Sequence, residues 1–314
     1  MSTVFFNVLP IFVLILTGWL LVRFRYLKPG VGDALAEFVF RVAVPVTLFR
    51  TIAGADMREG SPWTLWVAYF SGVAVAWTLA HLAATRLFGR DARIGVLAGV
   101  SAGFANTVFI GLPLVTMITG PDGIVAISIL LSVHLPVMMI AGTLMMEGAE
   151  RRIGERPPRP ALALMRDVFL NLIRNPLVIG LALGALWRLT GMTVPGPAMA
   201  VIDQLAATAA PAALVSIGMA LQKYGISGNL GLAATTSTLK LVVMPAVVYG
   251  LCLLLGLNQT WTTALVLTAS VPTGVNAWLI ANHFNTGQAL ASSTITLTTA
   301  IGVVSVSAWA FLLI

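Results

Sequence analysis

The polar residues best placed to do chemistry in this sequence lie inside two long apolar stretches. The first stretch, residues 101–120, reads SAGFANTVFIGLPLVTMITG and carries Asn106, Thr107, Gly111 and Pro113. Proline lacks a backbone N–H and its ring clashes with the carbonyl four residues back, while glycine adds backbone freedom. We therefore expect the helical hydrogen bonds to open between Asn106 and Pro113.

The second stretch, residues 267–284, repeats this combination of residues. It reads LTASVPTGVNAWLIANHF and carries Pro272, Thr273, Gly274 and Asn276. Backbone groups freed inside a bilayer have no water to bond, so a broken segment survives only where it is buried in protein or lines a polar cavity. Two such interruptions at matching places predict a binding site.

The chemistry of such a site favours an anion. Where two broken helices cross, each half-helix N-terminus presents unpaired N–H groups and the positive end of its macrodipole to a shared cavity, which suits a carboxylate. Asn106 and Asn276 either orient that carboxylate or satisfy backbone groups freed at the breaks, because an amide donates and accepts hydrogen bonds. Pro113 and Pro272 would set the shape. The predicted substrate-binding residues are Asn106, Thr107, Gly111, Thr273, Gly274 and Asn276.

The elements that must hold these residues are membrane-spanning helices. Of the 314 residues, 58% are hydrophobic and 9% are charged, and the mean hydropathy is +0.96; an average soluble domain has about 25% charged residues. A net charge of +7 would suggest nucleic acid as the partner of a soluble protein, but here the basic residues lie in short connections between apolar runs. We therefore expect a multi-pass protein of the lipid bilayer that binds no nucleic acid.

The apolar runs predict an all-α integral membrane protein with ten transmembrane helices. The spans are expected at residues 4–22, 33–53, 62–86, 94–118, 121–146, 168–190, 198–221, 233–256, 260–283 and 287–313. Most of the 18 Lys and Arg residues lie in the connections after spans one, three, five and seven. The positive-inside rule places these connections in the cytoplasm and both termini on the non-cytoplasmic side.

The spans divide into two sets of five. Residues 1–146 hold the first repeat, residues 147–167 form a basic, proline-rich cytoplasmic connection, and residues 168–314 hold the second repeat. Five crossings bring the chain to the opposite face, so a second copy of the same unit is inverted relative to the first. Pro45 in span two matches Pro211 in span seven, and each is either a simple kink or an element that flanks the crossing.

Three polar residues are candidates for ion coupling. An ionisable group inside a membrane is a functional hypothesis by default, so His134 in span five would carry a proton. The alternative is a neutral ring that a neighbouring hydroxyl satisfies. Asp203 and Gln204, near the outer end of span seven, would form a polar gate or bind a cation such as Na⁺. We expect Lys240 in span eight to extend its amine to the cytoplasmic surface.

Four regions of the chain resemble the auxin efflux carrier family, within the wider group that includes the bacterial bile-acid/sodium symporter fold. They read FVFRVAVPVTLFRTI, GFANTVFIGLPLV, AATAAPAALVSIGMAL, and ASVPTGVNAWLIANHF followed by GQALASSTITLTTAIGV. The resemblance implies two inverted five-helix repeats, with helices four and nine broken and crossing at mid-membrane, and elevator-like alternating access.

The resemblance also implies a cargo and a location. Bacterial members are commonly assigned to malonate and similar carboxylates, which indicates a transporter of the bacterial inner membrane that works as a homodimer. The chain lacks the long cytoplasmic loop of many plant members, which argues against auxin as its cargo.

Two other functions stay open at this point. The same scaffold would form an anion channel if both of its gates opened together. A membrane enzyme acting on lipid-linked substrates would need acidic or histidine clusters, and the sequence contains none, just as it contains no G-x-S-x-G, Walker A or H-E-x-x-H motif. We therefore expect a secondary transporter for a small organic anion, coupled to H⁺ or Na⁺ if it is active, with no enzymatic activity, no cofactor and no metal.

Overall fold

The computed structural model describes residues 2–54, 61–152, 154, 166, 170 and 173–314 of the chain. These residues form helices, and the one β-type contact among them is an isolated antiparallel bridge between Ala105 and Thr273. Within the described residues, five helical segments are long and apolar enough to cross a membrane, and four shorter apolar helices accompany them. The described part of the chain is therefore all-α, as the composition predicts.

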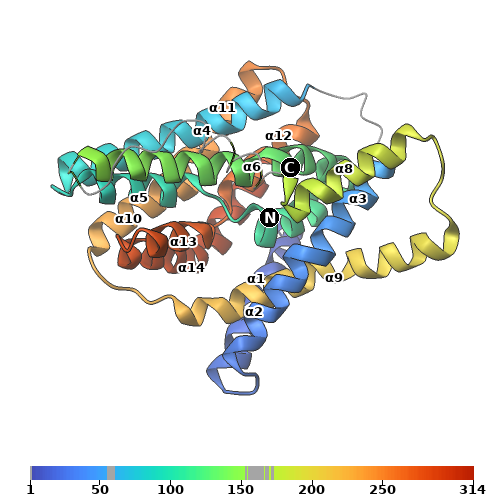
Figure 1. The fold of residues 1–314 in the computed structure, drawn as a ribbon, viewed down its shortest axis with the longest axis horizontal. Helices are drawn as coiled ribbons and strands as arrows, with labels where there is room; N and C mark the ends of the chain where they lie inside the picture. The colour runs from blue at the N-terminus through green and yellow to red at the C-terminus, as the bar shows by residue number, and fades with distance from the viewer. Residues whose placement is uncertain (1, 55–60, 153, 155–165, 167–169, 171–172) are drawn as a thin grey trace.

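Five helices form the first of two groups (Figure 1). They are α1 (Ser2–Arg23), α2 (Pro29–Phe38), α3 (Val44–Gly54), α8 (Pro176–Leu189) and α9 (Gly196–Ala220). Helix α9 packs against α1, α2 and α3, and α8 packs along α3. A Cβ atom on Gly218 would lie 1.9 Å from the carbonyl oxygen of Ile15, so the backbones of α9 and α1 approach too closely for any other residue. Small residues at such contacts are a common device of membrane helices.

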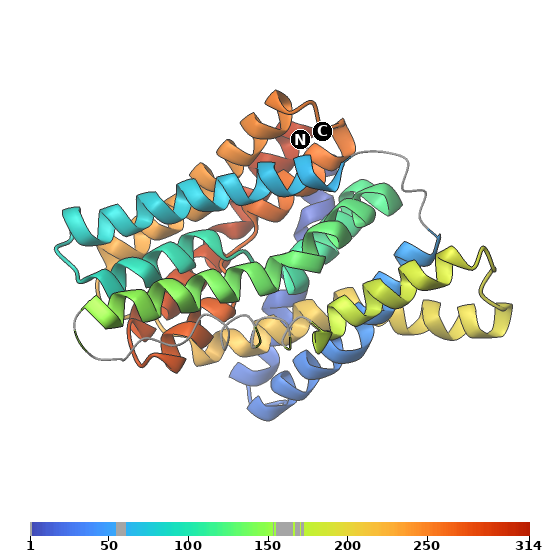
Figure 2. The same ribbon diagram turned by 45° about the horizontal axis from the view of Figure 1, so that its top comes forward.

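The second group combines helices from both halves of the chain. They are α4 (Pro62–Leu82), α5 (Ala92–Gly103), α6 (Leu112–Arg152), α10 (Leu230–Thr238), α11 (Met244–Leu254), α12 (Gln259–Ser270), α13 (Asn276–His283) and α14 (Gln288–Leu313). Helix α4 packs against α5 and α11, α12 lies along α6, and α10 packs against α14. In Figure 2 the blue helices α2 and α3 and the yellow helices α8 and α9 lie below and to the right of this second group, and α1 runs behind it toward the N-terminus at the top.

Helix α6 turns sharply at Gly120. Its φ of 65° and ψ of −153° are open to glycine alone, and they separate the predicted spans four and five. The helix then continues to Arg152, so Glu147–Arg152, the first residues of the predicted connection over residues 147–167, are helical. Residues 155–165 of that connection lie outside the described residues.

Four single-turn π-helices occur among the described residues, and three of them end two residues before a proline. These three are η1 (Val39–Ala43), η3 (Thr107–Gly111) and η5 (Leu239–Val243), and they precede Pro45, Pro113 and Pro245. A π turn adds a residue to the helical turn, which moves the carbonyl that a proline ring would otherwise strike, so the helix continues past the proline. The predicted opening between Asn106 and Pro113 is therefore wrong in position, because the chain opens earlier, at Phe104–Asn106. Two more short helices, η2 (Ala83–Leu87) and the 3₁₀-helix η4 (Leu221–Lys223), extend α4 and α9.

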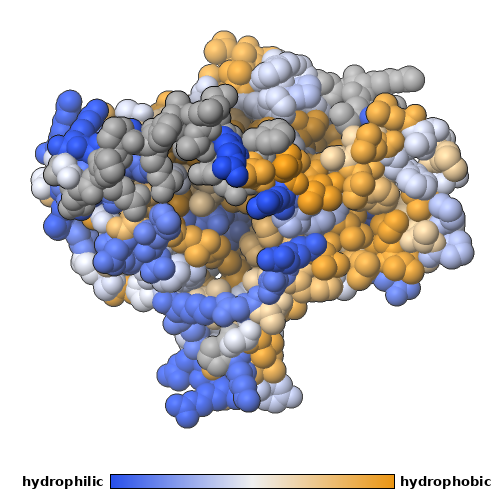
Figure 3. All heavy atoms as spheres, viewed as in Figure 1, coloured by the Kyte–Doolittle hydropathy of each residue, from blue (hydrophilic) through white to orange (hydrophobic). Residues whose placement is uncertain are grey.

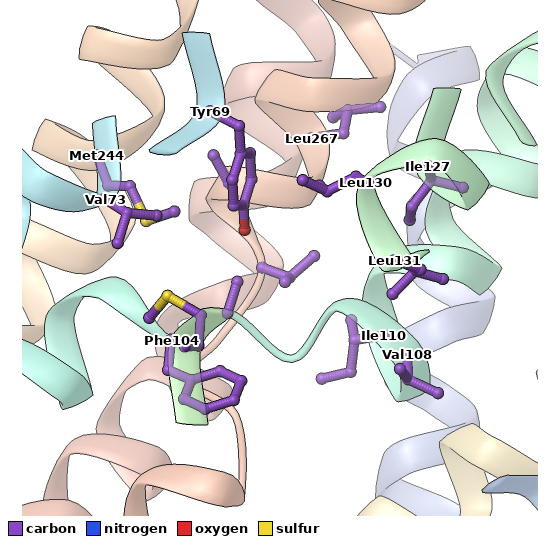
Figure 4. Close-up of a cluster of buried hydrophobic side chains, with 14 of the residues drawn as sticks. Tyr69, Val73, Phe104, Val108, Ile110, Ile127, Leu130, Leu131, Met244 and Leu267 are labelled. Atoms are coloured by element: carbon purple, nitrogen blue, oxygen red, sulfur yellow. The ribbon is translucent and has the colours of Figure 1, made fainter. Parts of the chain in front are cut away.

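The core surrounds the unwound segment that follows α5. Figure 4 shows buried side chains, among them Tyr69, Leu130 and Leu267, packed around the coil between Phe104 and Val108. On the surface, apolar residues cover much of the right-hand face, and hydrophilic residues gather at the left-hand and lower ends (Figure 3). An apolar surface of this kind, with polar ends, is consistent with a protein that lies in a bilayer.

Candidate functional site

The two unwound segments lie side by side and are joined by backbone hydrogen bonds. Residues 104–106 separate α5 from η3, and residues 271–275 separate α12 from α13. The N–H of Asn106 donates to the carbonyl of Pro272 at 2.9 Å, and the N–H of Gly274 donates to the carbonyl of Phe104 at 2.7 Å. Each segment satisfies groups that the other leaves free, which is what an apolar interior requires of non-helical backbone.

Thr273 and Gly274 hold this contact together. The hydroxyl of Thr273 donates to the carbonyl of Ser101 at 2.7 Å, and its N–H donates to the hydroxyl of Thr298 at 3.1 Å. A Cβ atom on Gly274 would lie 3.1 Å from the carbonyl oxygen of Ala105, so glycine permits the close approach of the two backbones. Both residues are predicted ligands, and the contacts that they make here are to protein.

A cavity of about 260 Å³, called here the crossing cavity, opens beside this contact. It is lined by both unwound segments, the helices that follow them, α6 and η1. The lining residues are Phe40, Phe104, Ala105, Asn106, Thr107, Val108, Phe109, His134, Leu135, Val275, Asn276 and Leu279. The N-termini of η3 and α13 both lie at this cavity, and helix N-termini carry partial positive charge.

Several hydrogen-bond donors at the crossing cavity have no acceptor within the described part of the chain. The Oδ1 atom of Asn106 accepts from the N–H of Phe109 at 3.3 Å, and its Nδ2 group donates to none of the described residues. The same is true of the backbone N–H groups of Val108 and Asn276 and of the Asn276 side chain. None of the described residues that line the cavity is acidic. Unpaired donors without a competing acid suit an anionic ligand.

His134 closes one side of the crossing cavity. Its side chain is buried, and its Nδ1 and Nε2 atoms lie 3.3 Å from the hydroxyl of Thr107 and 3.4 Å from that of Tyr69. In Figure 4 the Tyr69 hydroxyl points from α4 toward the unwound segment. A hydroxyl both donates and accepts, so each ring nitrogen has a partner in either neutral tautomer. This is the arrangement expected of a ring that neighbouring hydroxyls satisfy, and a proton-carrying role stays a prediction.

Comparison with known proteins gives this geometry a context. The family described as membrane transport protein matches residues 3–310. The chain belongs to this family. The match confirms the resemblance to the auxin efflux carriers that the sequence motifs indicate.

Proteins similar to this family member carry transporter names. It is 26% identical over 316 residues to a protein of Rhizobium meliloti (strain 1021) named "Putative malonate transporter". The matched region covers 98% of this chain and 94% of that protein. It is also 26% identical over 309 residues to an uncharacterized transporter of Methanothermobacter thermautotrophicus, with 98% and 97% covered. An uncharacterized transporter of Methanocaldococcus jannaschii is 22% identical over 315 residues, with 98% of both chains covered. The protein is therefore a multi-pass membrane transporter.

Two predicted coupling residues of this transporter lie away from the crossing cavity, on α9. Asp203 pairs with Arg50 of α3, with 3.1 Å between Oδ1 and Nη1, and Gln204 is exposed. The pair joins positions 153 residues apart, so no local pattern indicates it. Within the described residues, no group of three or more His, Cys, Asp or Glu side chains is placed to hold a metal ion.

The prediction that Lys240 reaches the cytoplasmic surface is wrong. Lys240 is fully buried in η5, and its amine donates to the carbonyl of Ala269 in the last turn of α12. Because α12 ends at Ser270, its last carbonyls have no helical donor, and a cation there is favourable. The lysine of this transporter therefore caps one of the two interrupted helices.

The remaining predicted residues stand around the crossing. Gly111 ends η3, and its N–H donates to the carbonyl of Asn106 at 3.0 Å. Pro113 lines a separate cavity, and Pro45 packs its backbone against Gly180 of α8. Pro211 lies inside a continuous α9. Contact of Gly111 with cargo and the shaping role of the prolines stay predictions. The cavity-lining Phe40 carries no sequence signal that sets it apart from other apolar residues.

Proposed function

We propose that the protein is a secondary transporter that moves a small organic anion, a mono- or dicarboxylate such as malonate, bound in the crossing cavity. One observation carries the proposal: Asn106, Val108 and Asn276 line a cavity with donors that have no acceptor among the described residues, and none of the described residues that line it is acidic. Its volume of about 260 Å³ is just below the roughly 300–1,000 Å³ of sites for drug-sized ligands, which suits a small acid. The name of the Rhizobium meliloti relative agrees with this cargo.

We further propose that the interrupted spans belong to two inverted five-helix repeats and cross at mid-membrane. The reciprocal hydrogen bonds between residues 104–106 and residues 272–274 support this arrangement. The interruptions also occupy matching places in the two halves of the chain, and each leads into a helix whose N-terminus lies at the crossing cavity. Discontinuous helices of this kind place cargo near the middle of the bilayer.

Alternating access would follow from movement of the second group of helices against the first. Glycine contacts tie the first group together: a Cβ atom on Gly180 would lie 2.5 Å from the carbonyl oxygen of Pro45, just as Gly218 meets α1. Phe40 is the only crossing-cavity lining residue from the first group among the described residues. The cargo would thus travel with the second group past the first, which would act as a fixed scaffold in an elevator-like cycle. Both termini would lie outside the cytoplasm of a bacterial cell. The scaffold helices would be available for a homodimer contact.

Flux measured in liposomes tests the site. Asn106→Ala and Asn276→Ala each remove a donor to a carboxylate, and a hydrogen bond to a charged group contributes about 1.5–3 kcal/mol. We therefore expect each variant to raise the malonate concentration at half-maximal uptake by about tenfold or more. Asn282→Ala, an exposed asparagine on the same helix α13, is the matched control and should leave uptake unchanged.

Uptake at wild-type rates and affinities by both Asn106→Ala and Asn276→Ala would show that the crossing cavity does not bind the cargo. A flux that rises with malonate concentration without saturating would instead identify an anion channel. Repeating the assay with and without a pH gradient and with and without Na⁺ identifies the coupling ion.

A further inference from the structure

A second cavity, of about 280 Å³ and called here the Arg50 cavity, lies between α3 and α9 of the first group and η3 and α6 of the second. Val108 lines both this cavity and the crossing cavity. Along the continuous rod of α2, η1 and α3, Phe40 lines the crossing cavity and Arg50 lines the second one. At 1.5 Å per residue the two positions are about 15 Å apart along the rod. The two cavities are therefore neighbours that lie at different levels along this helix.

Arg50 is the only charged side chain among the described residues that line the Arg50 cavity. Its one hydrogen bond to a described residue joins Nη1 to Oδ1 of Asp203 at 3.1 Å. A guanidinium has five N–H donors and matches a carboxylate through two parallel bonds, so this single contact leaves most of its donors unused. The side chains are 35% and 54% exposed, and an ion pair this open to solvent contributes little stability.

The other polar side chains of the Arg50 cavity are already engaged as donors. The hydroxyl of Thr47 donates to the carbonyl of Ala43 at 2.8 Å, and that of Thr116 donates to the carbonyl of Leu112 at 2.7 Å. Arg50 is thus the side chain with donors to offer a ligand there. Its present partner, Asp203, is itself a carboxylate, which is the chemical group that this guanidinium already binds.

We propose that Arg50 receives a carboxylate of the cargo in this cavity and that the cargo displaces Asp203 from it. Arg50 lies toward the end of α3 that leads to residues 55–60, a connection that the charge distribution assigns to the non-cytoplasmic side. The inference rests on the proposed function and adds a specificity-determining residue on one face of the membrane. A neutral analogue of the cargo would find no partner at this position.

Substitution of the two partners tests this proposal, because it predicts opposite effects. For uptake that starts on the non-cytoplasmic side, where Arg50 lies, Arg50→Gln should raise the malonate concentration at half-maximal rate by about tenfold, since a charge-assisted bond is lost. Asp203→Asn should lower that concentration by up to about fivefold, since a competitor worth about 0.2–1 kcal/mol is removed. Arg50→Lys keeps the cation and should fall between wild type and Arg50→Gln. Uptake from the opposite face should keep its half-saturation concentration in all three variants.

A purely structural ion pair gives a different pattern. Arg50→Gln and Asp203→Asn would then shift uptake in the same direction, and the exchanged pair Arg50→Asp with Asp203→Arg would restore it; either result overturns the proposal. Arg188→Gln, a cation on α8 that lines another cavity, is the control and should not change the half-saturation concentration. If Arg50→Gln keeps the wild-type affinity while Asn106→Ala impairs uptake, the role of Arg50 is refuted and the proposed function stands. Absence of malonate uptake by the wild-type protein would refute both proposals.

Discussion

Replacing Thr273 by valine tests whether the contact between the unwound segments stabilises the protein. Valine has nearly the same shape as threonine but lacks the hydroxyl that donates to the carbonyl of Ser101 at 2.7 Å. Thr273 is 1% exposed and Ser101 is fully buried, so no water replaces the lost donor. α5 ends at Gly103, and the described residues offer the Ser101 carbonyl no other donor.

The expected loss follows from that unsatisfied carbonyl. A buried polar group without its partner costs about 1–3 kcal/mol, so we take about 2 kcal/mol for Thr273→Val. With an unfolding entropy of about 2.1 cal/mol/K per residue, a chain of 314 residues loses about 1.5 °C of Tm for each kcal/mol. The variant should therefore melt about 3 °C below the wild type.

The single cysteine provides the assay. Cys252 is fully buried, so a thiol-reactive fluorophore gains signal as the protein unfolds in detergent on heating. Thr273→Ser keeps the hydroxyl and should melt within about a degree of the wild type. Thr238→Val removes an exposed hydroxyl that bonds only within its own helix and serves as the matched control. Equal melting temperatures for Thr273→Val and Thr238→Val would refute the reasoning.

Two further substitutions test the surroundings of the site. His134→Gln should keep the pH profile of malonate uptake, because an amide serves the hydroxyls of both Thr107 and Tyr69; a flattened profile in proteoliposomes would instead make His134 the proton carrier. Gly218→Ala should lower Tm, at a cost of about 1–3 kcal/mol, because the new Cβ atom would lie 1.9 Å from the carbonyl of Ile15. Gly250→Ala on α11, where a Cβ atom meets nothing within 4 Å, should leave Tm unchanged or raise it, and similar losses in the two variants would contradict the close approach of α1 and α9.

Local chemistry predicts the existence of both interruptions, but only one of their positions. Pro272 and Gly274 stand within the observed break at residues 271–275. In the first stretch Pro113 causes no break, because the π turn of η3 absorbs its ring, and the chain opens instead at residues 104–106. A proline in the sequence predicts that a helix is disturbed. It does not predict whether the helix unwinds there or continues through a wider π turn.

The features of the site that the sequence does not predict depend on contacts between residues far apart in the chain. Asn106 and Asn276 stand out because amides are unusual in an apolar run, and both line the crossing cavity. Lys240 is just as conspicuous, yet its burial depends on the end of α12 passing close by, which hydropathy does not reveal. The pairing of Arg50 with Asp203 depends in the same way on the packing of α3 beside α9.

The antiparallel bridge between Ala105 and Thr273 also bears on how the chain assembles during synthesis. Because synthesis runs from the amino terminus, the first unwound segment is made well before residue 272. Until then the amide of Asn106 and the carbonyl of Phe104 lack the acceptor and the donor that they have in the finished fold. The newly made amino-terminal half must therefore keep these backbone groups hydrated or shielded in another way. The crossing cavity is complete only after residues 275–279 have been added.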